Sequence, residues 1–347
     1  MFNKLFGKFS WDIGIDLGTK NTLVYTLEKG IVINEPSVVA VNTRTDEILA
    51  VGEDAKKMVG KTPSHIKAVR PLVDGVISDF EVTEKMIKHF VDKIHSESFA
   101  LIPRPKMVIG IPLEITEVEK KAVEDAARSA GAREVFLVEE VMAATVGVRL
   151  PVSEAVANMM VDIGGGTTEI AVISLGGVVT WKSLSVAGNT LDDNVVEYIK
   201  EEFNILVGEQ VAENIKIKIG SATPLREQLE MEVKGRDLMH GLPKAVMVND
   251  SQIRDALSKS TGQIIENIKT TLEITPPELI ADIYEHGIYL SGGGALLRGL
   301  DKEIAQATKI PVRITDDPLT CVVRGIGVLL NDQDLLKKIT VSEGGRV

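Results

Sequence analysis

The sequence predicts an α/β protein built from two duplicated domains, each with a mixed sheet of the five-stranded type flanked by helices. Three observations support this fold class. The chain contains an internal repeat, a helical pattern follows strand-like segments, and a length of 347 residues with 44% hydrophobic composition allows two separate cores. Aromatic residues make up only 4% of the chain, so these cores are expected to be aliphatic.

The repeat is the strongest of these observations. Residues 13–33 read IGIDLGTKNTLVYTLEKGIVI, and residues 159–179 read MMVDIGGGTTEIAVISLGGVV. Aligned without a gap, they share turn positions at which Asp16, Gly18, Thr22 and Gly30 fall on Asp162, Gly164, Thr168 and Gly176. Both segments are typical of strand, turn, strand, turn, strand. The alternative is two unrelated β-hairpins with common turn residues. Duplication instead predicts two related domains with a cleft between the two Asp-x-Gly turns.

Helical patterns follow the first copy. Thr116 and Glu119 have the spacing of a capping box, an apolar stripe of period 3.6 follows them, and Gly131 is a natural stop. A polar stretch at residues 152–158 is expected to mark the crossing into the second half. Residues 208–260 are charge-mixed, and we expect them to be helical.

Composition excludes several function classes. The net charge of -11, with no basic block, is unfavourable for nucleic-acid binding. The single cysteine, Cys321, cannot form an internal disulfide and fits a reducing cytoplasm. No apolar run is long enough to span a bilayer, and the N-terminus lacks the apolar core of a signal peptide. The histidines show no metal-ligand spacing.

Three glycine-rich turns follow apolar strands, at residues 16–22, 162–168 and 291–294. Glycine lets backbone N–H groups approach an anion closely, and threonine adds a donor. An aspartate at the strand end repels phosphate but can hold Mg²⁺ through water, so Asp16 and Asp162 together could clamp one magnesium nucleotide. A single such turn is more typical of a plain hairpin. Neither the Walker pattern nor G-x-G-x-x-G is present, so a P-loop or Rossmann site is not indicated.

These turns resemble those of the superfamily of actin, sugar-kinase and heat-shock-chaperone ATPases. Longer stretches resemble the MreB family of bacterial actins, which determine rod shape, over about Asp12 to Leu330. These stretches are NEPSVVA at residues 34–40, RPLVDGVISDF at 70–80, GRDLM at 235–239, TPPEL at 275–279 and GGGALLRGLD at 292–301.

The resemblance implies an actin-like ATPase fold with four subdomains around a nucleotide cleft. We expect domain I at residues 11–150 with a small insert at about 33–68. Domain II is expected at 151–330 with an insert at about 185–255, and residues 331–347 should return toward domain I before a frayed tail.

The resemblance also implies roles for individual residues, with ATP and Mg²⁺ as cofactors. Asp16 and Asp162 would orient Mg²⁺, and Glu140, helped by Thr167, would orient the attacking water. The nucleotide-binding positions would be Gly18, Thr19, Lys20, Asn21, Gly164, Gly165, Gly166, Thr167, Glu213, Asn214, Ile215, Lys216, Gly292, Gly293, Gly294 and Ala295.

Two positions depart from the family pattern. Lys20 stands where the family usually has Ala, and it either contacts phosphate or is solvated. Val141 stands where the family usually has Pro, which puts the geometry around Glu140 in question. Glu139 and Glu140 also have the alternative interpretation of a solvated acidic pair.

Two segments are predicted to contact a membrane. At residues 1–10, the apolar side chains recur on one helical face with lysines elsewhere, which is typical of a short interfacial amphipathic helix. The second segment is an apolar loop between a helix and the strand at 107–111, where the family has a membrane loop. The residues concerned are Phe2, Leu5, Phe6, Phe9, Phe99, Leu101 and Ile102. The alternatives are ordinary packing for both, or a disordered tail for the first.

The predicted function is therefore that of a bacterial cytoskeletal ATPase. ATP would favour head-to-tail homopolymer protofilaments, which we expect to pair, and slow hydrolysis would loosen them. The filaments would lie on the inner face of the cytoplasmic membrane and guide cell-wall synthesis with membrane-bound cell-shape proteins as partners, without nucleic acid. The alternatives are a sugar-type small-molecule kinase, for which no substrate-binding insert is found, and a chaperone-like ATPase, which needs a further client-binding domain.

Overall fold

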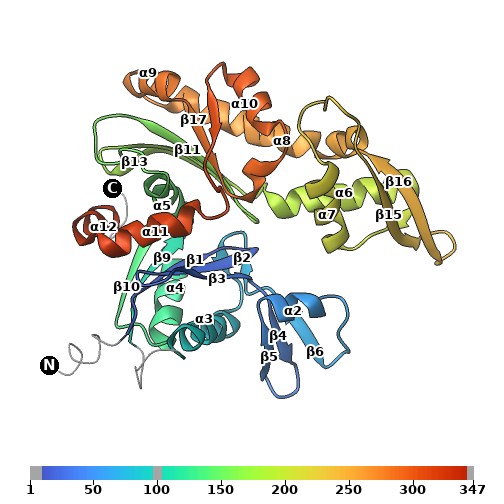
Figure 1. Ribbon diagram of the computed structural model, residues 1–347, viewed down its shortest axis with the longest axis horizontal. Helices are drawn as coiled ribbons and strands as arrows, with labels where there is room; N and C mark the ends of the chain where they lie inside the picture. The colour runs from blue at the N-terminus through green and yellow to red at the C-terminus, as the bar shows by residue number, and fades with distance from the viewer. Residues whose placement is uncertain (1–9, 97–103, 342–347) are drawn as a thin grey trace. The chain divides into compact units, whose positions relative to one another are not determined.

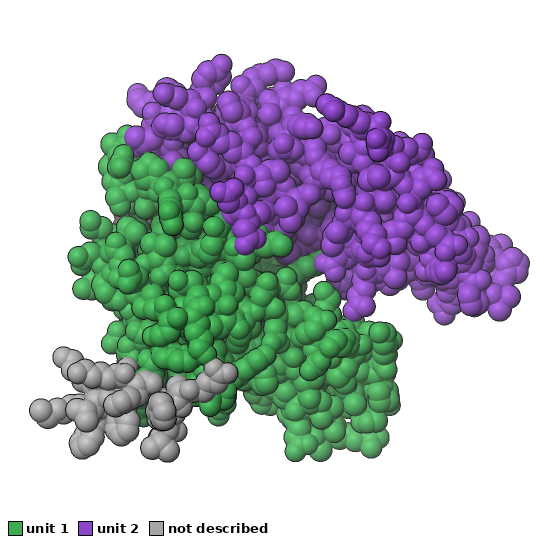
Figure 2. Space-filling model, viewed as in Figure 1, with its two compact units in different colours: residues 1–155, 173–178, 319–347 green, residues 156–172, 179–318 purple. Residues whose placement is uncertain are grey.

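The structure is a computed structural model, and it describes residues 10–96 and 104–341 (Figure 1). The predicted membrane residues Phe2, Leu5, Phe6, Phe9, Phe99, Leu101 and Ile102 lie outside the described residues, as does the predicted tail at 342–347. The chain forms two compact units (Figure 2). Unit 1 comprises Met1–Ala155, Ile173–Val178 and Leu319–Val347, and unit 2 comprises Val156–Val172 and Val179–Pro318.

Unit 1 is built on a five-stranded mixed sheet that holds the first copy of the repeat. Its order is β10 (Glu134–Glu139), β9 (Lys106–Ile111), β1 (Ile13–Leu17), β2 (Asn21–Thr26) and β3 (Gly30–Pro36). Strands β1, β2 and β3 pair antiparallel, whereas β9 pairs parallel to both β1 and β10. The described part of this unit includes the helices α3 (Phe80–His95), α4 (Glu117–Ser129), α5 (Glu140–Gly147), α11 (Cys321–Asn331) and α12 (Gln333–Ile339).

Two smaller sheets follow β3 in the chain. The first has the order β5 (Ile48–Val51), β4 (Val39–Asn42) and β6 (Ile66–Val69), and helix α2 (Glu53–Met58) packs on it. The second is the hairpin of β7 (Leu72–Val73) and β8 (Val76–Ile77).

The second copy of the repeat lies in a sheet of equivalent order. It runs β13 (Gly177–Leu184), β12 (Thr168–Ser174), β11 (Asn158–Ile163), β17 (Ile288–Ser291) and β18 (Val312–Ile314). Here β17 pairs parallel to β11 and to β18, as β9 does to β1 and β10. Gly30 and Gly176, which the repeat aligns, both have positive φ, at 75° and 79°. The predicted duplication therefore extends to whole sheets, and the predicted α/β class is confirmed.

The remaining elements of unit 2 are helices and a small antiparallel sheet. The sheet has the order β14 (Ile205–Leu206), β15 (Glu230–Asp237) and β16 (Pro243–Asn249). The helices are α6 (Gly188–Phe203), α7 (Glu209–Ile219), α8 (Asp250–Ile274), α9 (Pro277–His286), the 3₁₀ turn η2 (Gly293–Leu296) and α10 (Leu300–Thr308).

The expectation that residues 208–260 are helical was wrong at β15 and β16. In β15, Met231 and Val233 alternate with Glu230, Glu232 and Lys234, and only the apolar side of the strand is shielded from water. This is the period of two of a half-buried strand. The many charges on the outer side hid that period in the sequence.

A local sequence signal explains where helix α4 begins. Thr116 caps α4 with the predicted capping box, in which Thr116 Oγ1 accepts from Glu119 N and Glu119 Oε2 accepts from Thr116 N.

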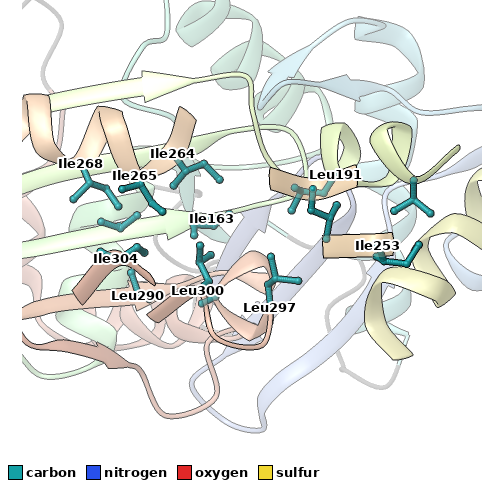
Figure 3. Close-up of a cluster of buried hydrophobic side chains, with 14 of the residues drawn as sticks. Ile163, Leu191, Ile253, Ile264, Ile265, Ile268, Leu290, Leu297, Leu300 and Ile304 are labelled. Atoms are coloured by element: carbon teal, nitrogen blue, oxygen red, sulfur yellow. The ribbon is translucent and has the colours of Figure 1, made fainter. Parts of the chain in front are cut away.

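The core of unit 2 is aliphatic, as expected from the composition, and Figure 3 shows Ile163, Leu290 and Leu300 within it. Ile163 directly precedes a predicted phosphate turn, so this core fixes the end of β11.

Candidate functional site

The parallel strands of unit 1 bring two predicted site segments to one edge of the sheet. In register, Ile15 lies beside Ile109 and Ile111 lies beside Glu139. The turn that follows β1 and the first residue of α5, Glu140, therefore both lie at the carboxyl ends of parallel strands. This is the edge at which open α/β sheets bind ligands.

Asp16 and Glu140 also share one face of that sheet. Gly14 and Gly110 both face α11, because a Cβ on either would lie close to Ile326, at 2.5 Å from its Cγ2 and 3.5 Å from its Cδ1 respectively. Asp16 follows Gly14 by two residues, so it points to the same face. A Cβ at Gly110 would also lie 3.3 Å from Glu140 Cγ, so the buried Glu140 side chain lies over Gly110, and the missing Cβ makes room for it.

The first glycine turn is tight and runs from half-buried Gly18 to exposed Asn21. A Cβ on Gly18 would lie 2.7 Å from the carbonyl oxygen of Asn21, which explains the glycine. Thr19 is buried, and its Oγ1 accepts a hydrogen bond of 2.9 Å from Gly75 N in the β7–β8 turn. Because the Thr19 oxygen is the acceptor, its O–H group can still donate to an anion.

Asp162 occupies the equivalent strand end in unit 2. It lies opposite Ser291 in the β11–β17 pair, and Ser291 Oγ donates a hydrogen bond of 2.6 Å to Asp162 Oδ1. Burial raises the pKa of the Asp162 carboxyl above its ordinary value, and the Ser291 hydrogen bond partly opposes this. A bound cation favours the ionised form of such a group.

The second glycine turn is held by the start of α6. Gly164 N donates to Thr167 O at 2.9 Å, which closes the turn. Gly188 N and Asn189 N donate to the carbonyls of Gly164 and Gly165 at 3.1 and 2.8 Å. The predicted residues Gly164, Gly165, Gly166 and Thr167 therefore form one compact turn, in which the start of α6 engages the carbonyls of Gly164 and Gly165.

The third glycine turn packs directly on the end of β11. Gly292 has φ of 77°, and a Cβ on it would lie 2.6 Å from the carbonyl carbon of Ile163. A Cβ on Gly294 would overlap the Ile163 side chain, with its Cβ only 2.8 Å away. Gly293 and Ala295 complete the 3₁₀ turn that starts there. The turns at 162–168 and 291–295 therefore adjoin each other in unit 2.

Helix α7 joins this group through Lys216. Lys216 Nζ lies 2.7 Å from Asp192 Oδ1, a fully buried carboxylate of α6, and donates to Gly188 O at 2.9 Å. Lys216 thus braces the helix start that holds the second turn. Ile215 is fully buried in the core, whereas Glu213 and Asn214 are half-buried.

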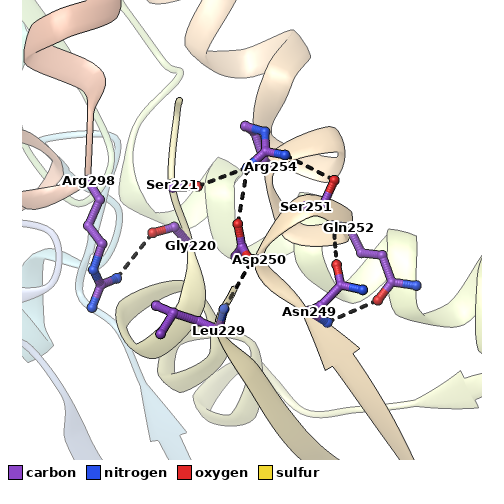
Figure 4. A network of polar contacts seen from close by, with 9 residues as sticks. All are labelled: Gly220, Ser221, Leu229, Asn249, Asp250, Ser251, Gln252, Arg254 and Arg298. Carbon is purple, nitrogen blue, oxygen red and sulfur yellow. Dashed lines mark hydrogen bonds and ion pairs between the residues drawn. The ribbon is translucent and has the colours of Figure 1, made fainter. Parts of the chain in front are cut away.

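The C-terminal end of α7 is tied to the segment after η2. Arg298 Nη1 donates to Ile217 O at 3.0 Å and to Gly220 O at 3.1 Å, and Figure 4 shows the second of these bonds. Nearby, Arg254 and Leu229 N both contact the carboxylate of Asp250, which fixes the start of α8 (Figure 4). The helix that carries the predicted nucleotide-binding positions 213–216 is therefore tied to the segment that follows the predicted turn at 292–295.

The donor set fits Mg²⁺ held mainly by phosphates and water. The described residues contain no group of three His, Cys, Asp or Glu side chains that could coordinate a metal on their own. The two aspartates at the strand ends are oxygen donors, which Mg²⁺ prefers, and Mg²⁺ usually keeps several waters. Asp162 Oδ1 is already oriented by Ser291, so the carboxylate has a fixed direction.

Comparison with known proteins decides the family. Residues 10–338 match the family model described as MreB/Mbl protein. The chain belongs to the MreB/Mbl family. It is 47% identical over 334 residues to "Cell shape-determining protein Mbl" of Bacillus subtilis, covering 96% of the chain and 100% of that relative. It is 49% identical over 339 residues to "Cell shape-determining protein MreB" of Escherichia coli, covering 96% and 97% respectively.

Solved structures of similar proteins confirm the predicted actin-like fold. MreB5 of Spiroplasma citri bound to ADP superposes with a TM-score of 0.89 at 37% identity, covering 93% of the chain and 97% of MreB5. The MamK double helical filament gives a TM-score of 0.77 at 25% identity, covering 93% and 99%. The resemblance to the MreB family seen in the sequence is thus confirmed. The assignment of individual residues to nucleotide, metal and catalysis stays a prediction.

Sequence reasoning gave no role to Ser37, Asp192 or Arg298, although each orients a predicted site element. Ser37 and Arg298 lie inside stretches that resemble the MreB family, which was the available signal. Asp192 carried no such signal, because a lone aspartate in a helix is usually solvated.

Proposed function

We propose that this MreB/Mbl-family chain binds and slowly hydrolyses Mg–ATP and uses it to assemble cytoskeletal filaments that direct cell shape. The observation that carries the proposal is the assembly of Asp162, the turn at 164–167 and the turn at 292–295 around one strand end in unit 2. The equivalent turn at 18–21 in unit 1 has the same position in its sheet. That both turns serve one nucleotide is part of the proposal.

Relatives support the nucleotide and the polymer. MreB5 of Spiroplasma citri has been solved bound to ADP and to AMPPNP, and MamK has been solved as a double helical filament. These properties are carried over to this chain here because its fold matches theirs over 93% of its length. Curated relatives at 47% and 49% identity are named for determining cell shape.

The proposed mechanism assigns the phosphates to backbone and hydroxyl donors. The turns at 18–21 and 164–167 would bind the phosphate oxygens, with Thr19 donating its O–H. Bound Mg²⁺ would neutralise charge on the phosphates, and Asp16 and Asp162 would hold it through its waters. Glu140 would accept a hydrogen bond from the attacking water and orient it, helped by Thr167.

The family membership favours this function over a sugar-type kinase. A kinase on the same fold would need a general base aimed at a substrate hydroxyl and a site for the sugar. The comparisons instead connect the chain with proteins that determine cell shape and form filaments. The cell-wall synthesis proteins expected as partners remain part of the proposal.

We also propose that the filaments lie on the cytoplasmic face of the membrane. None of the helices in the described residues is long and apolar enough to span a bilayer. Ser10 ends the first predicted membrane segment and Arg104 directly follows the second, and Arg104 N donates a hydrogen bond of 2.6 Å to Ser10 Oγ. Ser10 and Arg104 therefore lie together on unit 1, which supports a common surface for lipid.

The test is assembly of the purified chain with Mg–ATP, followed by light scattering and by electron microscopy on a lipid monolayer. We expect filaments with Mg–ATP and none for Asp162→Ala, because that variant loses a proposed magnesium contact. Asp255→Ala is the control, since Asp255 is an exposed carboxylate of α8. Normal filament yield from Asp162→Ala would count against the assignment of Asp162, and ADP release that depends on added sugar without assembly would support the kinase.

A further inference from the structure

Ser37 directly follows β3 and is completely buried, although it is polar. Its hydrogen bonds go to the first phosphate turn and to Thr22, which ends that turn. Its Oγ donates to Gly18 O at 2.6 Å, and its N donates to Lys20 O at 2.9 Å. Its Oγ also lies 2.9 Å from Thr22 Oγ1. One serine therefore contacts the turn at three points.

The directions of these hydrogen bonds follow from chemistry. A carbonyl oxygen can only accept, so the single hydroxyl proton of Ser37 points to Gly18 O. Thr22 must then donate its own proton to Ser37 Oγ. The proton order runs from Thr22 to Ser37 to Gly18, and a fully satisfied chain of this kind holds each oxygen in one orientation.

This series of hydrogen bonds determines which backbone groups of the turn are available to an anion. Carbonyl oxygens carry partial negative charge and repel phosphate, whereas N–H groups attract it. Ser37 engages the carbonyls of Gly18 and Lys20, so both point toward a buried residue. The turn is thereby held in a conformation in which the carbonyl oxygens of Gly18 and Lys20 accept hydrogen bonds from Ser37.

The duplicated turn in unit 2 has its carbonyls engaged in the same way by other atoms. Gly164, which the repeat aligns with Gly18, accepts from Gly188 N at 3.1 Å, and Gly165 accepts from Asn189 N at 2.8 Å. Thr168, which aligns with Thr22, donates its hydroxyl to Val186 O at 2.7 Å. For the Gly164 carbonyl of unit 2, the backbone N–H of Gly188 does what the Ser37 hydroxyl does for the aligned Gly18 carbonyl in unit 1. Two different donors for this one pair of equivalent carbonyls indicate a shared requirement of the two turns.

We propose that Ser37 is a positioning residue for nucleotide phosphates, which sets the turn at 18–21 by holding the carbonyls of Gly18 and Lys20. This inference rests on the proposed binding of Mg–ATP. It predicts a binding defect that depends on the phosphate groups of the ligand, because the contacts of Ser37 go to the proposed phosphate turn of unit 1 and not to the positions at 213–216 or 292–295.

The test compares Ser37→Ala with the wild-type chain and with Thr83→Val. Thr83 is an equally buried hydroxyl of unit 1, and its Oγ1 donates to Asp79 O at 2.7 Å, away from the turn. Affinity for Mg–ATP is measured by calorimetry, affinity for adenosine by ligand-observed NMR, and folding by the thermal midpoint. We expect Ser37→Ala to weaken Mg–ATP about tenfold and adenosine not at all, since a carbonyl of the turn loses its partner. Thr83→Val should leave both affinities unchanged.

A second pair of variants keeps the test decisive if Ser37→Ala does not fold. Thr22→Val removes the donor to Ser37 and should weaken Mg–ATP about threefold, whereas Thr22→Ser keeps the hydroxyl and should not. Folded Ser37→Ala or Thr22→Val with wild-type Mg–ATP affinity would overturn the role of Ser37, as would an equal loss for adenosine. If the wild-type chain itself does not bind Mg–ATP, the proposed function fails as well, and this outcome is seen before any variant is made.

Discussion

Glu139 and Glu140 are adjacent in the chain but have different surroundings. Glu139 ends β10 and is half-buried, whereas Glu140 begins α5 and is buried with its Cγ over Gly110. Both lie at the carboxyl end of β10, but Glu139 pairs with Ile111, whereas Glu140 lies over Gly110, on the sheet face to which Asp16 points. The alternative of a solvated acidic pair therefore fits Glu139 better than Glu140.

This difference makes the pair a matched test of the catalytic assignment. We expect Glu140→Gln to slow ATP hydrolysis about 100-fold, because an amide orients and activates water poorly. Affinity for ATP should stay close to that of the wild type. Phosphate release and binding of a fluorescent ATP analogue measure the two effects. Glu139→Gln is the control, and equal hydrolysis defects in both variants would remove Glu140 from its special role.

At the residue scale, the sequence predicted the site residues that occur in both copies of the repeat. It did not predict the residues that hold them in place by hydrogen bonds. Asp16 and Asp162 were found because the duplication aligns them. Ser37 acts on Gly18, which is 19 residues away, and Ser291 acts on Asp162, which is 129 residues away. Such contacts depend on which strands become neighbours, and no local pattern carries that information.

At the element scale, helices α5 and α11 of unit 1 pack closely against each other. A Cβ on Gly325 would lie 2.6 Å from the carbonyl carbon of Ala143 and still closer to its oxygen, and a Cβ on Gly147 would lie 2.9 Å from Gly325 N. The two helices therefore meet backbone to backbone at a pair of glycines. Because α5 begins at Glu140, this contact also fixes the helix that carries the proposed catalytic residue.

The contact predicts opposite effects for two glycine substitutions within helices. Gly325→Ala should lower the free energy of unfolding by about 1–3 kcal/mol, because the new methyl group overlaps α5. Gly262→Ala in α8 should raise it by roughly 0.5–1 kcal/mol, since a Cβ there has no neighbour within 4 Å and alanine favours a helix. Urea unfolding followed by circular dichroism measures both. A Gly325→Ala protein as stable as the wild type would show that the helices can separate at no cost.

Element prediction succeeded where one local rule determined the outcome. The capping box at Thr116 needs only neighbouring residues. It failed for β15 and β16, where exposed charges outnumber the buried positions. There the extended conformation is stabilised by antiparallel pairing of Glu230–Arg236 with Pro243–Asn249, and the sequence pattern alone did not indicate this pairing.

At the scale of the whole molecule, the duplication predicted from one pair of segments organises both large sheets. The orders β3-β2-β1-β9-β10 and β13-β12-β11-β17-β18 are equivalent strand by strand. Only the first three strands of each sheet belong to the repeat seen in the sequence. The strands added beside them, and the insertions that follow β3 and β13, diverged too far for a repeat to be visible.

The attachment of the chain to a membrane is tested at this same scale, because weak contacts of single subunits add up along a filament. We expect a chain lacking residues 1–9 to co-sediment less with vesicles of anionic phospholipid, while its affinity for ATP stays unchanged. The paired substitutions Leu5→Ser and Phe6→Ser should reproduce most of the loss, since each buried large apolar side chain contributes about 1.5–3 kcal/mol. Asn3→Ser is the control on the same segment. If the shortened chain still sediments fully with vesicles, residues 1–9 do not provide the contact, and the segment before Arg104 becomes the place to test next.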